Sequence, residues 1–380
     1  MKTNPLVALG QAGQSPWLDY IHRGMIASGE LARRIAEDGI RGVTSNPTIF
    51  EKAVSSGHDY DAQIRSLARA RTTLLEAYKA IVTDDIRAAA DVLRPVYDAS
   101  RGGDGYVSLE VDPDLARDTK ATIARARELF DAVGRPNVMI KIPGTKEGLP
   151  AVEETIASGI PVNVTLIFSV RRYEEVAEAY LRGVERWIAS GGDPRVVASV
   201  ASFFVSRIDT AVDALLLSTV ERWPGSPKAG TALSLLGKTA VASARLAYAR
   251  FLVIFGTPRW RSLALLGARV QRPLWASTGT KNPKFSDVKY IEELIGPDTV
   301  NTIPPQTMDA FRDHGVVADV LSGAAAVAEA KAVLDDYALM ETGIEEVCAR
   351  LEEEGVKSFL DSYRKLLAAV EGRLSTASNG

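Results

Sequence analysis

A lysine lies inside an apolar run that otherwise has the pattern of a buried strand. The segment NVMIKIPG places Lys141 between two isoleucines and just before Pro143 and Gly144. An unpaired ammonium in such a strand is costly, and the group either loses its proton or requires a buried partner. A desolvated amine is a nucleophile at neutral pH and forms Schiff bases with ketones. The position of Lys141 therefore predicts either a buried ion pair or a reactive amine.

Polar side chains also lie near the ends of the neighbouring apolar runs. They are Asp19, Ser45, Asn46, Glu110, Asp112, Asn163, Thr165, Ser202, Ser277, Asn301 and Thr302, with Arg207 following the sixth run. In a closed barrel of parallel strands, the reacting groups lie at the carboxyl ends of the strands. We therefore expect these side chains to line one polar cavity. Carboxylates and a hydroxyl beside an amine can move the protons that form and dehydrate a carbinolamine.

Several of these residues also have a purely structural explanation. An asparagine before a proline, as at Asn46, is typical of a turn or a helix start. Glu110 alone fits a surface carboxylate on an edge strand, and Thr165 is an ordinary strand former. Lys141 is harder to explain in this way, because a solvent-exposed strand would not require the apolar residues that flank it. The joint pattern favours a functional role for the others.

The elements that must position these groups alternate along the chain. Strand-like runs occupy residues 15–21, 41–46, 105–111, 137–142, 160–168, 196–204, 272–278 and 298–304. Amphipathic segments with helical spacing separate them. This alternation predicts an α/β fold with parallel strands, and eight units favour a (β/α)8 barrel. A doubly wound open sheet is the alternative, because a strand count alone does not establish closure.

Additional helices are predicted in three places. Residues 50–103 have the pattern of at least two helices, and residues 205–271 that of a helical excursion with a loop at WPGSPKAG, residues 223–230. The tail from Pro304 to about Leu374 is strongly helical, and the final STASNG is expected to fray. We expect a single domain over residues 1–380, with the barrel in about 15–320 and C-terminal helices, about 305–374, packed on it.

Composition excludes several classes of partner. The chain has 380 residues, 46% of them hydrophobic and 24% charged, with a net charge of -3. This balance gives no basic surface, so neither nucleic acid nor an anionic membrane is an expected partner. The single cysteine, Cys348, excludes an intrachain disulfide and suits a reducing compartment. Since no uncharged segment approaches the ~20 residues that span a bilayer, we expect a cytoplasmic protein.

Signals for a cofactor or a metal are weak. The segment GTALSLLGKTA ends like a phosphate-binding loop, but it has Ala232 where that motif requires glycine. The segment GGDGY lacks the glycine spacing of a dinucleotide-binding fingerprint. The three histidines, His22, His58 and His314, lie far apart without ligand-like spacing. We therefore expect neither a cofactor nor a metal site.

A family resemblance emerges from these segments taken in order. SPWLDYI, GVTSNPTIFEKA, VSLEVDP, VMIKIPGTKEG, PVNVTLIFS, VASFFVSRID and QRPLWASTGTKNP resemble the transaldolase family, in its longer bacterial form, over roughly residues 15–320. The resemblance implies a cofactor-free TIM-barrel enzyme of the pentose phosphate pathway, and we expect a monomer or homodimer. Such enzymes transfer a dihydroxyacetone unit from sedoheptulose 7-phosphate to glyceraldehyde 3-phosphate. The products are erythrose 4-phosphate and fructose 6-phosphate.

The resemblance also implies four catalytic roles. Lys141 corresponds to the lysine that forms the Schiff base with the donor ketone. Asp19 corresponds to the acid/base that takes the hydroxyl proton as the carbon–carbon bond breaks. Glu110 and Thr165 correspond to the pair that holds the water for carbinolamine dehydration.

Substrate-binding roles follow from the same resemblance. Asn46, Asn163 and Ser202 correspond to groups that hold the dihydroxyacetone moiety. Arg207 and Ser277 correspond to groups that bind the phosphate.

Two further positions concern specificity. Related fructose-6-phosphate aldolases tend to carry glutamine at the position of Glu110 and tyrosine at that of Phe204, so this pair favours a transaldolase over an aldolase-like lyase. A non-catalytic sugar-phosphate-binding barrel is the third hypothesis. Shorter transaldolases have an arginine two residues after Ser277, where this chain has Gly279. Lys281 is the candidate for the second phosphate-binding cation, as a point charge in place of a bidentate group.

Overall fold

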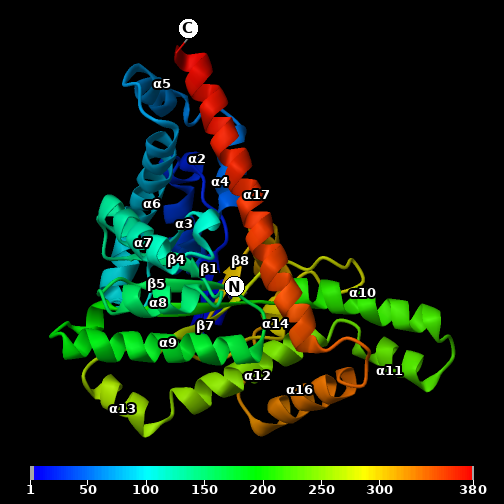
Figure 1. Cartoon of the computed structure of the whole chain (residues 1–380). Coiled ribbons are helices and arrows are strands. Elements are labelled where there is room, and N and C mark those ends of the chain that lie inside the picture. The colour runs from blue at the N-terminus through cyan, green and yellow to red at the C-terminus, as the bar shows by residue number, and fades with distance from the viewer. Residues whose placement is uncertain (1–3, 379–380) are drawn as a thin grey trace.

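The computed structural model describes residues 4–378 and forms a closed barrel of eight parallel strands (Figure 1). The strands follow one another around the barrel in sequence order, and β8 pairs with β1 to close it. They are β1 (Gln14–Leu18), β2 (Gly42–Thr44), β3 (Tyr106–Glu110), β4 (Val138–Pro143), β5 (Val162–Ile167), β6 (Ser199–Phe204), β7 (Arg272–Ala276) and β8 (Thr299–Ile303). The predicted (β/α)8 barrel is confirmed, and the β1–β8 pairing excludes the open sheet.

Helices surround the barrel and cover its strands. They are α1 (Pro5–Gln11), α2 (Arg23–Ala27), α3 (Glu30–Asp38), α4 (Pro47–Ser55), α5 (Asp61–Arg69), α6 (Leu74–Ala99), η1 (Pro113–Leu115), α7 (Thr119–Val133), α8 (Gly148–Ile156), α9 (Val170–Ala189), η2 (Pro194–Val196), α10 (Ser206–Arg222), α11 (Pro227–Leu235), α12 (Thr239–Ile254), α13 (Pro258–Leu265), α14 (Lys289–Glu292), α15 (Pro305–His314), α16 (Ala324–Tyr337) and α17 (Ile344–Ser378). The additional helices predicted in all three regions are present.

Two local predictions were wrong in part. The loop predicted at residues 223–230 ends at Ser226, and α11 begins at Pro227. The Ser226 hydroxyl accepts a hydrogen bond from the amide of Ala229 at 3.1 Å, and proline fits the first helical position because it needs no amide there. The predicted fraying of residues 375–380 is contradicted up to Ser378, the last residue of α17; residues 379–380 lie outside the described part.

The strands are buried on both faces because helices pack outside and side chains fill the inside. Every strand residue is buried except Arg272, which is half-buried. Inside the barrel, the ring of Trp17 packs against Gly42, where a Cβ atom would lie 2.4 Å from ring carbons. A glycine at this position of β2 therefore makes room for the largest side chain of β1.

Polar groups close the amino-terminal end of the barrel. Asp104 accepts hydrogen bonds from the Trp17 indole at 2.8 Å and from the Ser15 hydroxyl. Arg272 completes the cluster, with 3.2 Å to Asp104 and 2.8 Å to Ser15. The charges of Asp104 and Arg272 balance each other without a ligand. This end of the barrel therefore has a structural role, and the opposite end is available for chemistry.

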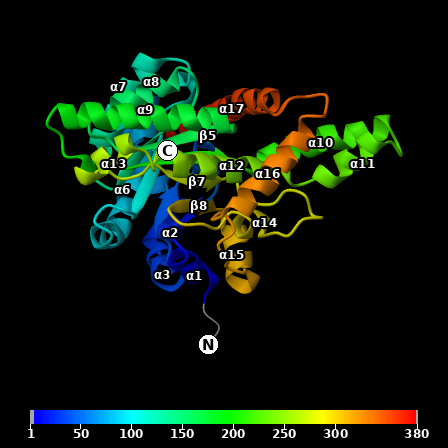
Figure 2. The ribbon, with the colours of Figure 1, turned by 90° about the horizontal axis from the view of Figure 1, so that it is seen from below.

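Helices on the periphery extend beyond the barrel ring. Figure 2 shows α10 and α11 projecting to one side, with α16 beside α11. Within residues 4–378 no single helix is long and apolar enough to cross a membrane, although α12 and α13 pass that test together with a 69° bend between them.

Replacement of Gly42 tests how tightly the barrel interior is packed. We expect Gly42→Ala to lower the free energy of unfolding by about 1–3 kcal/mol or more, because the new methyl group overlaps the Trp17 ring. Chemical denaturation at equilibrium measures the change. Gly230→Ala is the matched control: Gly230 lies in α11 with open space around it, so alanine there is expected to stabilise by about 0.5–1 kcal/mol. Equal effects of the two substitutions would contradict the packing argument.

Candidate active site

A buried lysine and a buried glutamate lie side by side at the carboxyl ends of two neighbouring strands. The pairing of β3 with β4 sets Glu110 directly opposite Lys141. The Lys141 Nζ atom lies 3.5 Å from Glu110 Oε2, and the two residues are only 5% and 4% exposed. Nζ also donates a hydrogen bond to the Ser45 carbonyl at 3.2 Å. Lys141 therefore has a buried partner, and it lies beside a carboxylate able to exchange protons with it.

Glu110 titrates in a range useful for proton transfer. Burial raises the pKa of Glu110 to about 7, although the charge of Lys141 acts in the opposite direction. Its Oε2 atom accepts no hydrogen bond from any described residue. A carboxyl group with a pKa near neutrality can both donate and accept a proton at physiological pH.

A second carboxylate lies at the end of β1. Asp19 Oδ1 accepts a hydrogen bond from the Thr44 hydroxyl at 2.7 Å, and that hydroxyl lies 2.5 Å from the Thr302 hydroxyl. Burial raises the pKa of Asp19, while the charge of Lys141 and the Thr44 hydrogen bond lower it. The sequence analysis did not identify Thr44, because a threonine within a strand gives no signal of which side chain it will contact.

A hydrogen-bonded row of side chains links β6, β5 and β3. Ser202 donates to Asn163 Oδ1 at 2.7 Å, and Asn163 Nδ2 donates to the Ser108 hydroxyl at 3.0 Å. All three residues are buried, and Asn163 is paired in register with Lys141. Thr165, also buried, has a hydroxyl with no hydrogen-bond partner among the described residues. This row fixes the orientation of an amide and leaves one hydroxyl available for a ligand or a water.

A half-buried arginine follows β6. The Arg207 guanidinium carbon lies 5.2 Å from the centre of the Phe204 ring, and within residues 4–378 no carboxylate pairs with it. Burial lowers the pKa of Arg207, although the charges of Glu110 and Asp19 act to raise it. The hydroxyl of Ser206, which precedes Arg207 in the chain, lies 2.9 Å from that of Ser277, and Ser277 has a positive φ of 56°. A guanidinium without a carboxylate partner among the described residues is available to an anion.

Two predicted residues lie less centrally. The Asn46 side chain accepts a hydrogen bond from the Ile49 amide at 3.0 Å, so it caps α4, as its structural explanation predicted. Lys281 is exposed, and its Nζ lies 3.8 Å from where a Cβ on Gly279 would stand. Its charge also lowers the pKa of Asp19, after the larger effect of burial in raising it. The Lys281 amine thus bends back toward the barrel.

Two residues that we expected in the cavity are directed elsewhere. Asp112 pairs with Arg125 of α7 at 2.9 Å, and Asn301 donates to the Tyr290 carbonyl of α14 at 3.3 Å. Asn301 and Thr302 are consecutive on β8, and successive strand residues point to opposite faces. Since Thr302 contacts Thr44 inside the barrel, Asn301 faces the outer helices.

A residue of α17 completes the group. The Phe359 ring centre lies 5.8 Å from Lys141 Nζ and 5.8 Å from the Arg207 guanidinium carbon. The sequence indicated that this helix is amphipathic, but not which surface its apolar face covers. Sequence reasoning therefore missed Phe359.

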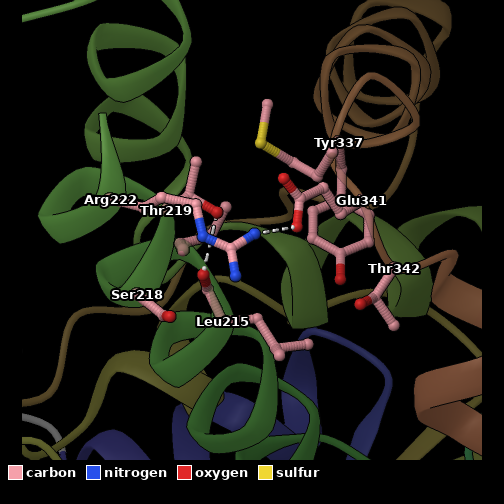
Figure 3. A pocket seen from close by; sticks show the side chains of 9 residues that line it. Leu215, Ser218, Thr219, Arg222, Tyr337, Glu341 and Thr342 are labelled. Carbon is pink, nitrogen blue, oxygen red and sulfur yellow. Dashed lines mark hydrogen bonds and ion pairs between the residues drawn. The ribbon is translucent and has the colours of Figure 1, made fainter.

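A separate pocket lies between α10 and the segment after α16 (Figure 3). It has a volume of about 210 Å³ and includes Arg222, Tyr337 and Glu341 in its wall. Arg222 and Glu341 face each other across it at 2.9 Å, as the dashed line in Figure 3 marks. Its cation is already paired, and none of the residues in its wall was predicted to belong to the site.

Comparison with known proteins gives a consistent result. The family model described as Transaldolase/Fructose-6-phosphate aldolase matches residues 16–370. A protein named Transaldolase from Parafrankia sp. (strain EAN1pec) is 49% identical over 99% of this chain and 100% of its own length. Transaldolases from Thermobifida fusca (strain YX) and Mycobacterium tuberculosis (strain ATCC 25618 / H37Rv) are 50% and 49% identical, over 98% and 99% of this chain and 99% of each relative.

The raised pKa of Glu110 predicts a pH dependence of stability. The folded protein binds this proton more tightly than the unfolded chain, whose glutamate has the ordinary value of 4.5. The free energy of unfolding should therefore fall between pH 4.5 and about 7, on the order of 1–3 kcal/mol from this group. Glu110→Gln should remove that part of the fall in denaturation at pH 5 and pH 8. Glu371→Gln, at an exposed position, is the control; identical pH dependence in all three proteins would contradict the prediction.

Proposed function

This chain belongs to the transaldolase/fructose-6-phosphate aldolase family and is a transaldolase, a transferase, and we propose that it works through a Schiff base on Lys141. The observation that carries the proposal is the buried Lys141 amine, 3.5 Å from a carboxylate that titrates near neutral pH. The donor is sedoheptulose 7-phosphate and the acceptor glyceraldehyde 3-phosphate.

The first stage forms the covalent bond to the donor. Lys141 gives up a proton to Glu110, and its nitrogen electron pair attacks the C2 carbonyl carbon of the ketose. A proton then passes from that nitrogen to the C2 oxygen, which gives the carbinolamine. Its C2 hydroxyl takes the proton from Glu110 and leaves as water, and a positively charged iminium remains. Thr165, with its free hydroxyl, holds the water that relays this proton.

The second stage breaks and remakes a carbon–carbon bond. Asp19 takes the proton of the C4 hydroxyl, and the electrons of the C3–C4 bond move toward the iminium nitrogen. Erythrose 4-phosphate leaves, and the dihydroxyacetone unit stays on Lys141 as a neutral enamine. The enamine carbon then attacks the acceptor aldehyde, whose oxygen recovers the proton from Asp19. Water adds to the resulting iminium by reversal of the first stage, the carbon–nitrogen bond breaks, and fructose 6-phosphate leaves Lys141. The burial that raises the Asp19 pKa suits this exchange of a proton.

Binding groups hold both ends of the donor. Asn163 and Ser202, already oriented by their mutual hydrogen bond, hold the dihydroxyacetone hydroxyls together with Asn46. Arg207 and Ser277 bind the phosphate, and Lys281 supplies a second cation. The absence of a carboxylate paired with Arg207 among the described residues supports this role, since the guanidinium is available to an anion.

We also propose partners, a compartment and an oligomeric state for the chain. Sugar phosphates are the partners supported by the relatives, and we propose a cytoplasmic monomer or homodimer in which residues 1–380 form a single domain. An aldolase-like lyase with the same lysine is the alternative. Glu110 and Phe204 favour the transferase.

Acceptor dependence separates the two reactions. With fructose 6-phosphate as donor and no added metal or cofactor, glyceraldehyde 3-phosphate should be released catalytically only when erythrose 4-phosphate is present. Catalytic release without the acceptor would identify a lyase.

Replacement of Lys141 tests the covalent step. We expect Lys141→Met to abolish the adduct that borohydride traps with fructose 6-phosphate, because the variant has no amine at this position. Mass spectrometry of the intact protein measures the adduct. Lys146→Met, which removes an exposed amine on the same segment, should leave the adduct yield unchanged. An unchanged yield in Lys141→Met would disprove the assignment.

Replacement of Arg207 tests the phosphate site. Arg207→Ala should raise KM for phosphorylated donors by about 10- to 100-fold, the loss of one charge-assisted contact of about 1.5–3 kcal/mol, and should spare dihydroxyacetone as a donor. Lys281→Met should give a smaller change with the same donor selectivity. Initial rates with both donors measure the effect; equal losses with the two donors would place Arg207 outside the phosphate site.

A further inference from the structure

Helix α17 is held over the mouth of the barrel from both sides. At one side the Cys348 thiol lies 3.2 Å from the Phe168 carbonyl, just after β5. At the other side the Ser362 hydroxyl lies 2.8 Å from the Thr48 hydroxyl in α4. Figure 1 shows α17 as one continuous helix that passes the barrel and continues along α4 toward α5. The segment between these two anchors therefore faces the carboxyl ends of the strands.

At Gly355 the helix packs tightly against a residue of β5. A Cβ atom on this residue would lie 2.8 Å from Leu166 Cδ2 and 3.6 Å from an Arg207 guanidinium nitrogen. Leu166 has a positive φ of 59°, and the pairing of β5 with β6 shifts between Val164 and Ile167. Leu166 directly follows Thr165. The irregular backbone at Leu166 therefore lies both beside a residue of the site and under α17.

Phe359 lies one turn further along the same face of α17. It is 4% exposed, and its ring lies within 5.8 Å of both the Lys141 amine and the Arg207 guanidinium. These are the cations at the two ends of the donor in the proposed function. The Phe359 ring would therefore contact a donor bound between Lys141 and Arg207.

We propose that Phe359 is a specificity-determining residue: its ring covers the Lys141 adduct and limits access of water, so that transfer to an aldehyde exceeds hydrolysis. The proposal rests on the proposed function, because it assigns a role at the same amine. It also identifies α17 as a part of the site that comes from outside the barrel. Phe204 contributes a second ring, 5.2 Å from the Arg207 guanidinium carbon.

The competing reaction is defined by the chemistry of the enamine. If its nucleophilic carbon takes a proton from water, a carbon–hydrogen bond forms and the iminium of dihydroxyacetone results. Water then adds to the iminium carbon, the carbon–nitrogen bond breaks, and its electron pair returns to the Lys141 nitrogen. The net change is consumption of one water and release of dihydroxyacetone. The two reactions diverge at the first of these steps, because an iminium is hydrolysed in both. Exclusion of water from the enamine carbon slows its protonation, whereas the acceptor aldehyde brings its own electrophilic carbon.

The simplest competing explanation is that Phe359 only anchors the helix. Tyr363 provides the comparison, since it lies one turn along on the same helix, is also 4% exposed, and packs against Tyr78 at 5.3 Å. Tyr363→Leu removes an aromatic ring of equal burial from the same helix without touching Lys141 or Arg207. An effect specific to the covering of the amine should appear with Phe359 substitutions alone.

The test measures the ratio of acceptor-independent dihydroxyacetone release to acceptor-dependent transfer, with fructose 6-phosphate as donor. We expect Phe359→Ala to raise this ratio by about tenfold, equivalent to 1.4 kcal/mol between the two barriers, while borohydride still traps the adduct. Phe359→Leu, which keeps an apolar side chain, should raise it less, and Tyr363→Leu should leave it unchanged. An unchanged ratio in Phe359→Ala, or an equal rise in Tyr363→Leu, would overturn the proposal. Absence of the adduct in the unmodified protein would instead refute the proposed function.

A second pair of variants does not depend on removing the ring. Gly355→Ala adds a methyl group against Leu166, whereas Gly372→Ala makes the same change on the same helix in open space. We expect Gly355→Ala to raise the ratio, because its methyl group displaces the Leu166 side chain on which α17 packs at the barrel mouth, and Gly372→Ala to leave it at the value of the unmodified protein. If both glycine variants give the unmodified ratio with stable folding, α17 does not control access of water.

Discussion

Burial of an ammonium requires a nearby counter-charge, and this requirement organises the mouth of the barrel. Lys141 projects from a strand whose two faces are covered, so water cannot stabilise its charge. Strand register places Glu110 opposite Lys141, and its Oε2 atom supplies the counter-charge 3.5 Å from the Lys141 amine. The Ser45 carbonyl accepts a hydrogen bond from the same amine. The carboxylate that stabilises the ammonium is consequently the group best placed to take its proton. The structural need and the proposed chemistry involve the same pair of atoms.

The two ends of the barrel treat buried charge differently. At the amino-terminal end, Asp104 has hydrogen bonds from Trp17 and Ser15 as well as its ion pair with Arg272. At the carboxyl end, Glu110 Oε2 and the Thr165 hydroxyl have no hydrogen-bond partner among the described residues. A buried polar atom without a partner lowers stability, so a substrate or water that supplies the missing bond to Glu110 or Thr165 would recover that free energy. Asp104 is fixed by its hydrogen bonds and its ion pair, whereas Glu110, 3.5 Å from the Lys141 amine, keeps an oxygen that a ligand can engage.

Much of this arrangement could be predicted from the sequence, for a physical reason. A parallel barrel brings every strand end to one rim, so polar residues that end separate apolar runs must approach one another, as Lys141, Glu110 and Asn163 do. The prediction that Asn301 lines the cavity was wrong because successive residues at a strand end point to opposite faces of the sheet. Only the register determines which of them points into the barrel. Phe359 was missed because an amphipathic helix specifies its own apolar face but not the surface that it covers.

The cover of the barrel mouth depends on contacts between distant parts of the chain. The Thr48–Ser362 contact joins residues 314 apart, more than the 285 that separate Gln14 from Thr299 where β8 closes the barrel against β1. Helix α17 has no surface to cover until the barrel exists, so it docks after the strands have paired. By the same argument it detaches early on partial unfolding. A warmed or mildly denatured population would therefore contain barrels with intact strands, an intact lysine and an open mouth. In such a population the preference for transfer over hydrolysis would be lost before the ability to bind a ketose.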